Sequence, residues 1–327
     1  MKEVIIAPTM KRTREDDNNT IATDNNPHDG MSLFGTSIGE APKQLFKPMR
    51  YQHTGIASDI DQRDRDDPLA VAEYAQDMYA HFKEQEMSMS VRPTYLSWQP
   101  EVTNHMRSVL VDWLVSVHLQ YKLQQETLYL AVNLIDRYLE KATVARSKLQ
   151  LVGATCMFIA AKYEEVYNCP RARDIYLICD RLYPKQEIIQ METVILSALG
   201  YKISAPTPLT FLVRYLKAGH SDSRIALLAS YLLEGTLSHY PLLQYRPSQL
   251  AAASVLIARN AHNRHPWSPT LLKYTDYLEE DVIPVANAIL EARARLPSDI
   301  QAINAKYSRK CFGRVSYMEL SYIPQSW

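Results

Sequence analysis

The fold is decided by residues 106–165. These read MRSVLVDWLVSV at 106–117, QETLYLAVNLIDRYL at 125–139 and SKLQLVGATCMFIAAKYEE at 147–165. Each segment is as long as a helix, mostly apolar, and lacks the period-two alternation typical of strands. A helix that is apolar over most of its girth is buried or meets a second apolar partner. The chain is therefore predicted to be all-α and to present a helical surface to another protein.

A weaker copy of the third segment occurs later in the chain. The sequence QLVGAT at 150–155 corresponds to QLAAAS at 249–254. Small residues let neighbouring helices approach closely, so each copy is expected to lie in the central helix of its own bundle. The repetition predicts two stacked helical units.

Composition and helix-start signals divide the chain into five parts. Residues 1–66 are rich in Asp and Asn and poor in aromatic residues, so they are predicted to be disordered. Residues 67–103 form an N-terminal helix and linker, in which Asp67 caps the helix and Pro68 occupies its first turn. The remaining parts are a first unit at 104–204, a second unit at 205–300, and a C-terminal extension at 301–327.

Local signals place the helices within these parts. The N-terminal helix is predicted to run to about Met87 with one apolar stripe of Val71, Tyr74, Met78 and Phe82. Ser147 and Gln150 form a capping-box pattern, and Gly200 stands where a helix-terminating residue belongs. The predicted helices are 104–121, 126–140, 147–163, a short one after Pro170, 184–199, 208–218, 222–238, 247–260, 269–276 and 279–296.

Charge and cysteine content exclude several classes of protein. The chain has 36 basic and 36 acidic residues, which disfavours binding to nucleic acid or to an anionic membrane surface. Its four cysteines form no C-x-x-C pair, as expected of a reduced intracellular protein. No apolar run approaches the roughly 18–20 residues that span a bilayer. We expect the protein in the nucleus and cytoplasm.

Motifs for catalysis or cofactor binding fail on their context. Gly35–Gly39 matches G-x-S-x-G, but no strand precedes it and no helix follows it. Residues 30–37 have the outer spacing of a P-loop but lack its lysine, and no G-x-G-x-x-G occurs. His262 and His265 lack a third metal ligand nearby in sequence. We therefore expect no enzymatic activity, no cofactor and no metal. The short basic cluster at 11–14 is a weak match to a nuclear-import signal.

Charged residues inside apolar helices need partners. Arg107 and Asp136 each lie in a strongly apolar segment, and we predict that they pair and lock two helices together. Lys162 either sits favourably at a helix C-terminus or joins Glu192 as a charged pair displayed to a partner. The residues alone leave both interpretations of Lys162 open.

Several of these segments resemble the A- and B-type mitotic cyclins. The matching stretches include MRSVLVDWLV, LYLAVNLIDRYL, KLQLVGATCMFIAAKYEE, QMETVIL, APTPLTFL and WSPTLLKYTDYLEE, and EYAQDMYAHF is closest to the B-type. The resemblance covers about residues 73–320. It implies two tandem five-helix cyclin boxes with an N-terminal helix. It also implies a regulatory subunit, itself non-catalytic, that binds and activates a cyclin-dependent Ser/Thr kinase and docks its substrates, controlling cell-cycle progression at G2/M.

The same resemblance assigns two surfaces by matching motifs. The implied kinase-binding residues are Lys162, Glu192, Tyr163, Glu165, Leu196, Tyr201, Ile203, Tyr74, Met78 and His81. The implied docking patch for Arg-x-Leu substrates or inhibitors comprises Met106, Val109, Leu110, Trp113, Ser116, Leu149, Gln150 and Asp180. Without the resemblance, the patch residues also fit an ordinary core, although a helix this apolar favours an exposed patch.

Two features depart from the family pattern. Ser116 and Gln120 stand where A-type cyclins carry acidic residues, so a weaker preference for basic docking peptides is expected than in A-type cyclins. The segment before the first unit carries neither an R-x-x-L destruction box nor a KEN triplet. A transcription-type cyclin-box protein is a rival interpretation, but the balanced charge and the missing C-x-x-C pairs disfavour it.

Overall fold

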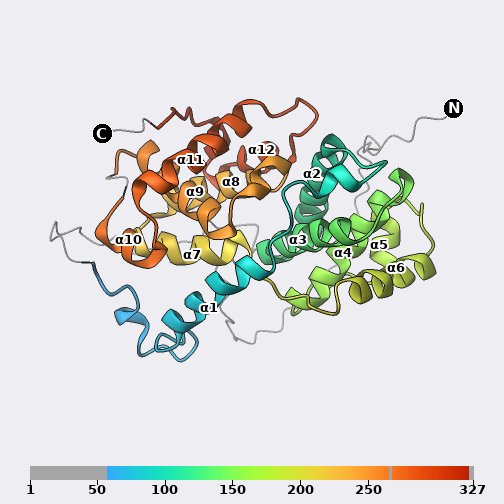
Figure 1. Ribbon diagram of the computed structural model, residues 1–327, viewed down its shortest axis with the longest axis horizontal. Helices are drawn as coiled ribbons and strands as arrows, with labels where there is room; N and C mark the ends of the chain where they lie inside the picture. The colour runs from blue at the N-terminus through green and yellow to red at the C-terminus, as the bar shows by residue number, and fades with distance from the viewer. Residues whose placement is uncertain (1–56, 265–266, 324–327) are drawn as a thin grey trace, which may run out of the picture.

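The computed structural model describes residues 57–264 and 267–323. Within these ranges the chain forms twelve α-helices joined by loops and short 3-10 turns, and no strand occurs there. Figure 1 shows two helical groups side by side, with α2–α6 (residues 104–198) on one side and α7–α11 (residues 208–294) on the other. The helix α1 (Ala75–Ser88) runs along the lower edge of the molecule in this view, beneath α7 and α3. The all-α prediction is confirmed.

The observed helices follow the predicted order. The first unit contains α2 (Asn104–Tyr121), α3 (Gln125–Lys141), α4 (Leu149–Glu164), α5 (Ala172–Ile178) and α6 (Lys185–Ala198). The second contains α7 (Pro208–Ala218), α8 (Ser223–Thr236), α9 (Pro247–Ala261), α10 (Pro269–Thr275) and α11 (Glu279–Ala294). The flanking helices are α1 (Ala75–Ser88) and α12 (Ala302–Tyr307).

Each unit is built around one central helix. In the first, α4 packs against α2, α3, α5 and α6; in the second, α9 packs against α7, α8 and α11. Gly153 shows why small residues are needed in α4. A Cβ built there would lie 2.6 Å from Cδ1 of Leu110 on α2, so any side chain at this position would force Leu110 to shift.

Helix ends follow from local chemistry. Asp222 accepts hydrogen bonds from the amides of Arg224 and Ile225, both 3.0 Å long, and so caps α8. Proline occupies the first position of α7, α9 and α10. After α6, Gly200 adopts a φ of +60° as predicted for a helix-terminating glycine.

The two units are joined by polar contacts between α2 and the loop after α8. Arg107 pairs with Asp136 through two 2.6 Å hydrogen bonds and donates a third, 2.8 Å long, to the Leu237 carbonyl. The Ser108 hydroxyl donates to the Ser238 carbonyl at 2.6 Å. The pair expected to lock two helices of one unit therefore also fixes the second unit against the first.

The boundaries at the N-terminal side differ from the prediction. Residues 57–66 are ordered, because Asp61 is held by Arg214 of α7; the rest of the predicted disordered segment, 1–56, lies outside the described residues. The N-terminal helix begins at Ala75 and not at Asp67. Asp67 caps only a turn, through Leu69 N, and Val71 adopts a φ of +46°, which a right-handed helix cannot contain.

One other local prediction is wrong. The capping box of Ser147 and Gln150 is not formed, because a 3-10 turn at 146–148 leads directly into α4. The C-terminal extension contributes to the core through the short helix α12. Lys306 on α12 is 1% exposed and pairs with the fully buried Glu234 of α8 at 2.6 Å, while Tyr307 donates a 2.9 Å hydrogen bond to the same carboxylate.

Candidate functional site

The Lys162–Glu192 pair lies where α4 and α6 pack together. The Lys162 ammonium is 2.7 Å from Oε1 and 2.9 Å from Oε2 of Glu192. It also lies 4.0 Å from the centre of the Phe158 ring, one turn earlier on α4. The side chains are 45% and 14% exposed, respectively. The pair is thus preformed yet open to solvent, so its remaining hydrogen-bonding capacity faces outward.

The helices that carry this pair also carry large side chains that are left exposed and do not enter the core. Tyr163, next to Lys162, is 52% exposed, and Tyr201 is 66% exposed. The end of α6 brings Tyr201 beside Leu196, because the Tyr201 amide donates to the Leu196 carbonyl at 2.9 Å while Gly200 bonds Ser197. Ile203 is only partly buried.

Glu165, also expected at the kinase interface, has an internal role. Its Oε1 accepts a 2.6 Å hydrogen bond from the Gln124 amide and a 2.7 Å bond from the Thr127 hydroxyl. These groups stand at the start of α3, where unpaired amides favour an acceptor. The carboxylate therefore ties the end of α4 to the start of α3, and one of its oxygens is already used.

The third part of the predicted kinase surface is the outer face of α1. Tyr74 at the cap of this helix is 57% exposed and Met78 is 44% exposed, and His81, one turn further along, is exposed as well. Their spacing of four and three places them on one face. The adjacent side of the helix packs on the second unit through Ala75, Tyr79, Phe82 and Glu86. The predicted stripe does not act as one unit, because Phe82 packs on the core, Tyr74 and Met78 are exposed, and Val71 precedes the helix.

The predicted docking patch is only partly exposed. Met106, Val109 and Trp113 recur at spacings of three and four on α2 and are partly buried, with Trp113 also touching the small core between α4, α5 and α6. Ser116 is exposed, Gln150 partly buried, and Asp180 exposed in the loop after α5.

The assignment of Leu110 and Leu149 to this patch is wrong, because these side chains are only 0% and 1% exposed. Leu110 points toward Gly153 of α4, and Leu149 begins that helix inside the core. Both support the patch from beneath and do not line it.

Burial shifts the pKa of groups at the junction of the units. Burial raises the pKa of the Asp112 carboxyl, whose Oδ1 also accepts a 2.7 Å hydrogen bond from the Ala302 amide of α12. Burial lowers the pKa of His118 to about 3, with a smaller contribution from Lys306. Burial lowers the pKa of Arg107, but the charge of Asp136 raises it. The net result is a raised pKa for Arg107. These groups are structural, because none of them belongs to the exposed pair or its apolar rim.

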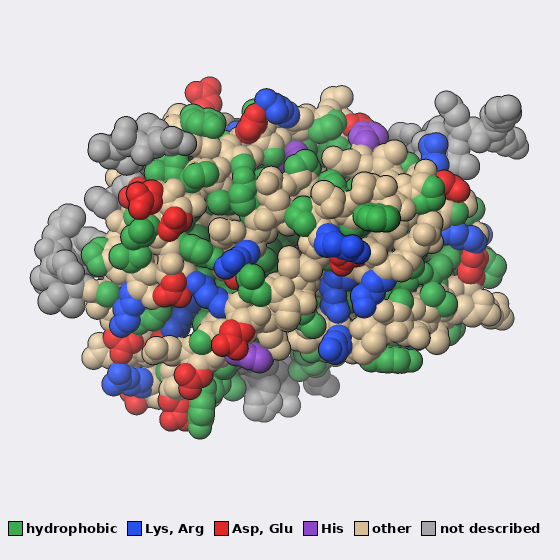
Figure 2. Space-filling view, in the orientation of Figure 1, with side chains coloured by type: hydrophobic (Ala, Val, Ile, Leu, Met, Phe, Trp, Pro, Cys, Tyr) green, Lys and Arg blue, Asp and Glu red, His purple; other side chains and the backbone are tan. Residues whose placement is uncertain are grey.

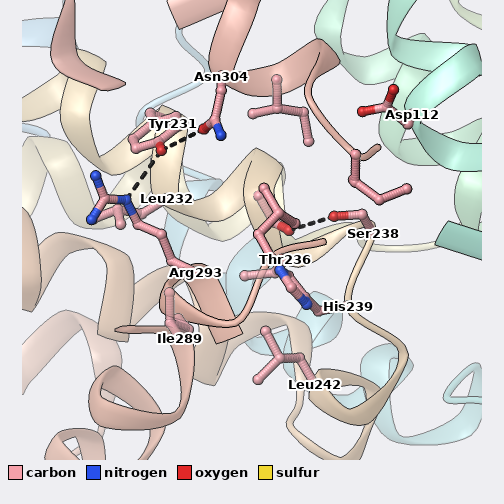
Figure 3. A pocket seen from close by; sticks show the side chains of 14 residues that line it. Asp112, Tyr231, Leu232, Thr236, Ser238, His239, Leu242, Ile289, Arg293 and Asn304 are labelled. Carbon is pink, nitrogen blue, oxygen red and sulfur yellow. Dashed lines mark hydrogen bonds between the residues drawn. The ribbon is translucent and has the colours of Figure 1, made fainter. Parts of the chain in front are cut away.

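A pocket separate from these surfaces lies between α2, α8, α11 and α12 and is shown in Figure 3. Three of its polar side chains bond one another. The Tyr231 hydroxyl donates to Asn304 at 2.7 Å and accepts from Arg293 at 3.1 Å. The remaining walls are largely apolar. This cavity therefore offers no convergent set of unpaired groups for chemistry.

Metal-binding clusters and membrane-spanning helices are absent from residues 57–264 and 267–323. In these ranges no group of three His, Cys, Asp or Glu side chains is placed to hold a metal ion; His265 lies outside the described residues. The described helices include none with the length and apolar character to cross a bilayer. On the face shown in Figure 2, basic side chains gather right of the centre, and acidic and basic side chains are interspersed at the lower left.

Comparison with known proteins places this arrangement in a family. The N-terminal domain of the cyclins matches residues 77–204, and their C-terminal domain matches residues 206–321. The chain belongs to the cyclin family. The two units are the two cyclin boxes, and the fold resembles the X-ray structure of a viral cyclin from herpesvirus saimiri. That match has a TM-score of 0.58 and 23% identity, and it covers 65% of this chain and 96% of the viral one.

The curated relatives of this cyclin carry mitotic names. It is 41% identical to G2/mitotic-specific cyclin-1 of Medicago sativa subsp. varia and to Cyclin-B2-1 of Oryza sativa subsp. japonica, over 79% and 78% of this chain. It is 37% identical to G2/mitotic-specific cyclin-B3 of Gallus gallus over 96% of this chain and 79% of that protein. The chain spans about 60% of the length of the two plant relatives. The resemblance to B-type mitotic cyclins is confirmed.

Proposed function

We propose that this cyclin is a non-catalytic regulatory subunit that binds and activates a cyclin-dependent Ser/Thr kinase. The single observation that carries the proposal is the solvent-open Lys162–Glu192 pair, with the exposed rings of Tyr163 and Tyr201 at the ends of the same two helices. An exposed ion pair adds little to stability, and exposed apolar clusters mark interaction surfaces. The combination suits a partner whose backbone groups meet the pair while its apolar side chains cover Tyr163, Leu196 and Tyr201.

Activation follows as a population shift. An active kinase requires a Lys–Glu ion pair between its third strand and its mobile helix. A cyclin surface that fits only the conformer with this pair assembled moves the kinase toward it, by as much as the difference in affinity between the two states. The cyclin then needs no catalytic group of its own, and its rigid two-unit scaffold supplies the preformed shape.

Substrate docking is the second part of the proposal. Met106, Val109 and Trp113 line one partly buried face of α2, away from the Lys162 end of α4. An Arg-x-Leu segment inserting one leucine against Trp113 gains about 1.5–3 kcal/mol, which suits reversible docking. With Ser116 neutral and Asp180 the remaining carboxylate, the arginine is held less strongly than in A-type cyclins.

The experiment is a pull-down of purified cyclin-dependent kinases with the recombinant chain, followed by phosphorylation of histone. Stoichiometric binding and a rise in kinase activity are the expected results. The rival view, a transcription-type cyclin-box protein, predicts binding to DNA or polymerase and no activated kinase. The mitotic names of the relatives lead us to propose action at G2/M, in nucleus and cytoplasm, which imaging of the tagged chain through a synchronised cycle tests.

A further inference from the structure

The attachment of α1 rests on polar contacts more than on apolar burial. Of the fourteen residues of this helix only Ala75 and Glu86 are buried, and Tyr79 and Phe82 are partly buried. So small an apolar contact holds a helix weakly. Directional contacts to the second unit must therefore fix where the outer face with Met78 lies.

The first such contact caps the start of α9. Glu86 accepts a 2.9 Å hydrogen bond from the Ser248 amide and a 2.7 Å bond from the Ser248 hydroxyl. The N-cap position of α9 holds Arg246, whose side chain gives no cap to the first amides. A glutamate from a different helix thus supplies the negative charge that a helix N-terminus favours.

The second contact caps the end of α10. The Lys83 ammonium donates to the carbonyl of Thr275, the last residue of α10, and lies 2.9 Å from a carboxylate oxygen of Asp276. It also lies 4.6 Å from the centre of the Tyr277 ring. A cation at a helix C-terminus is favourable, and it complements the anion that Glu86 places at an N-terminus.

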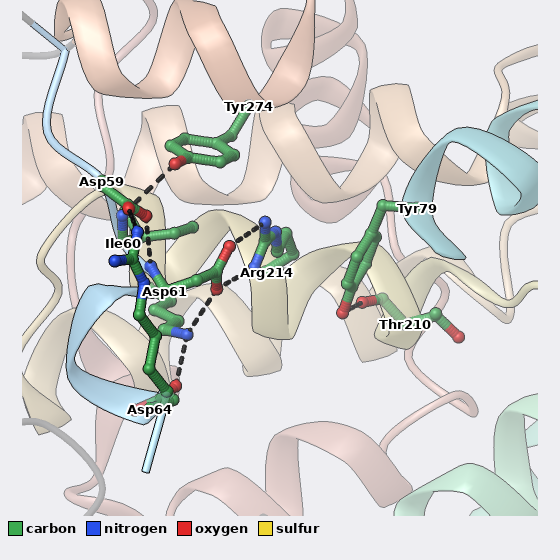
Figure 4. Close-up of polar contacts among 10 residues, drawn as sticks. Asp59, Ile60, Asp61, Asp64, Tyr79, Thr210, Arg214 and Tyr274 are labelled. Atoms are coloured by element: carbon green, nitrogen blue, oxygen red, sulfur yellow. Dashed lines mark hydrogen bonds and ion pairs between the residues drawn. The ribbon is translucent and has the colours of Figure 1, made fainter. Parts of the chain in front are cut away.

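The third contact joins α1 to the ordered segment before it, as Figure 4 shows. The Tyr79 hydroxyl donates a 3.2 Å hydrogen bond to the Thr210 carbonyl. Beside it, the Arg214 guanidinium lies between the rings of Tyr79 and Tyr274, 5.0 and 4.9 Å from their centres, and binds Asp61 through hydrogen bonds of 2.5 and 2.6 Å. One arginine of α7 thereby connects α1, α10 and the N-terminal segment.

We infer that Lys83 and Glu86 are positioning residues: by capping α10 and α9 they hold the kinase-facing side of α1 in place relative to the Lys162–Glu192 pair. The inference deepens the proposed function and rests on it. The proposed kinase surface is composite, because its pair belongs to the first unit whereas α1 is anchored on the second. Neither positioning residue lies on the outer face with Met78, so each acts on the kinase only through the placement of α1.

The test combines hydrogen exchange in the free chain with kinase affinity. In Glu86→Ala, amide exchange across 75–88 is expected to rise about 10- to 100-fold, as expected from the loss of charge-assisted hydrogen bonds. Exchange in α3 and α4 is expected to stay unchanged, which shows that the first unit remains folded. The apparent kinase Kd is expected to rise about three- to tenfold, since only the fraction with α1 in place binds fully.

Matched variants separate positioning from charge and from folding. Glu84→Gln removes the same charge from an exposed position of α1 and is expected to leave exchange protection across 75–88 unchanged. Lys83→Met is expected to behave like Glu86→Ala, while Lys83→Arg keeps a donor for the Thr275 carbonyl and restores both exchange protection and affinity.

Two results would overturn the inference: unchanged exchange of α1 in Glu86→Ala, or lost protection with wild-type kinase affinity. A wild-type chain that binds no kinase refutes the proposed function and with it the kinase link. In that case the exchange data alone still decide whether the caps hold α1, so the two failures are distinguishable.

Discussion

Replacing Arg107 with leucine is expected to destabilise the whole chain. The guanidinium is 1% exposed and makes three hydrogen bonds, two of 2.6 Å to Asp136 and one of 2.8 Å to the Leu237 carbonyl. Without it, the Asp136 carboxylate, 3% exposed, keeps only the 2.7 Å hydrogen bond from the Tyr95 hydroxyl. Removing one partner of a buried ion pair costs about 3–5 kcal/mol.

The assay is thermal and urea unfolding of wild type, Arg107→Leu, Asp136→Leu and the double variant. For large domains, each kcal/mol lost lowers the melting temperature by about 2–4 °C. The melting temperature of the single variant should therefore fall by roughly 6–20 °C. The double variant leaves no unpaired buried charge, so its loss of stability should be far less than the sum of the two single losses. A single-variant loss below about 1 kcal/mol, or simple additivity, would refute the reasoning.

The remaining predictions concern the extension, acid stability and docking. Lys306→Met leaves the buried carboxylate of Glu234 without its charged partner and should lower the free energy of unfolding in urea by about 3–5 kcal/mol. A loss near zero would show that α12 is not part of the core. His118 must be neutral in the folded chain, so stability should fall as pH drops below its ordinary pKa of 6.5 toward the folded value of about 3. The loss should reach about 2 kcal/mol between pH 7 and 5, measured as wild type against His118→Gln; parallel curves would contradict it. Trp113→Ala should slow phosphorylation of an Arg-x-Leu substrate about tenfold and spare a short peptide, and equal slowing of both would count against a docking patch.

The helices could be predicted from the sequence because their signals are local. Proline and capping residues at Pro208, Asp222 and Pro269 mark starts that the structure reproduces within a residue or two. The pair of Arg107 and Asp136 could also be anticipated, since two opposite charges in apolar helices have few other ways to be satisfied.

The contacts that place α1 and α12 could not be predicted in this way. Glu86 meets Ser248 across 162 positions and Lys306 meets Glu234 across 72, and no periodicity encodes such partners. For Glu86 one signal was present: α9 starts after an arginine and needs an outside acceptor. Leu110 shows the opposite limit. The periodicity of apolar residues in a helix cannot distinguish an exposed patch from the core beneath it. In the structure, the close approach of Leu110 to Gly153 shows that Leu110 belongs to the core.

The most direct test of the account is the kinase affinity of Lys162→Ala with Glu192→Ala. The pair is exposed on one side and adds little to folding, so helical circular dichroism and the unfolding midpoint should match wild type. Affinity for the kinase that wild type binds should fall at least about 100-fold, as expected for residues at the centre of an interface. Wild-type affinity in the double variant, or loss of the fold together with binding, would contradict the claim that this pair is a partner-binding site.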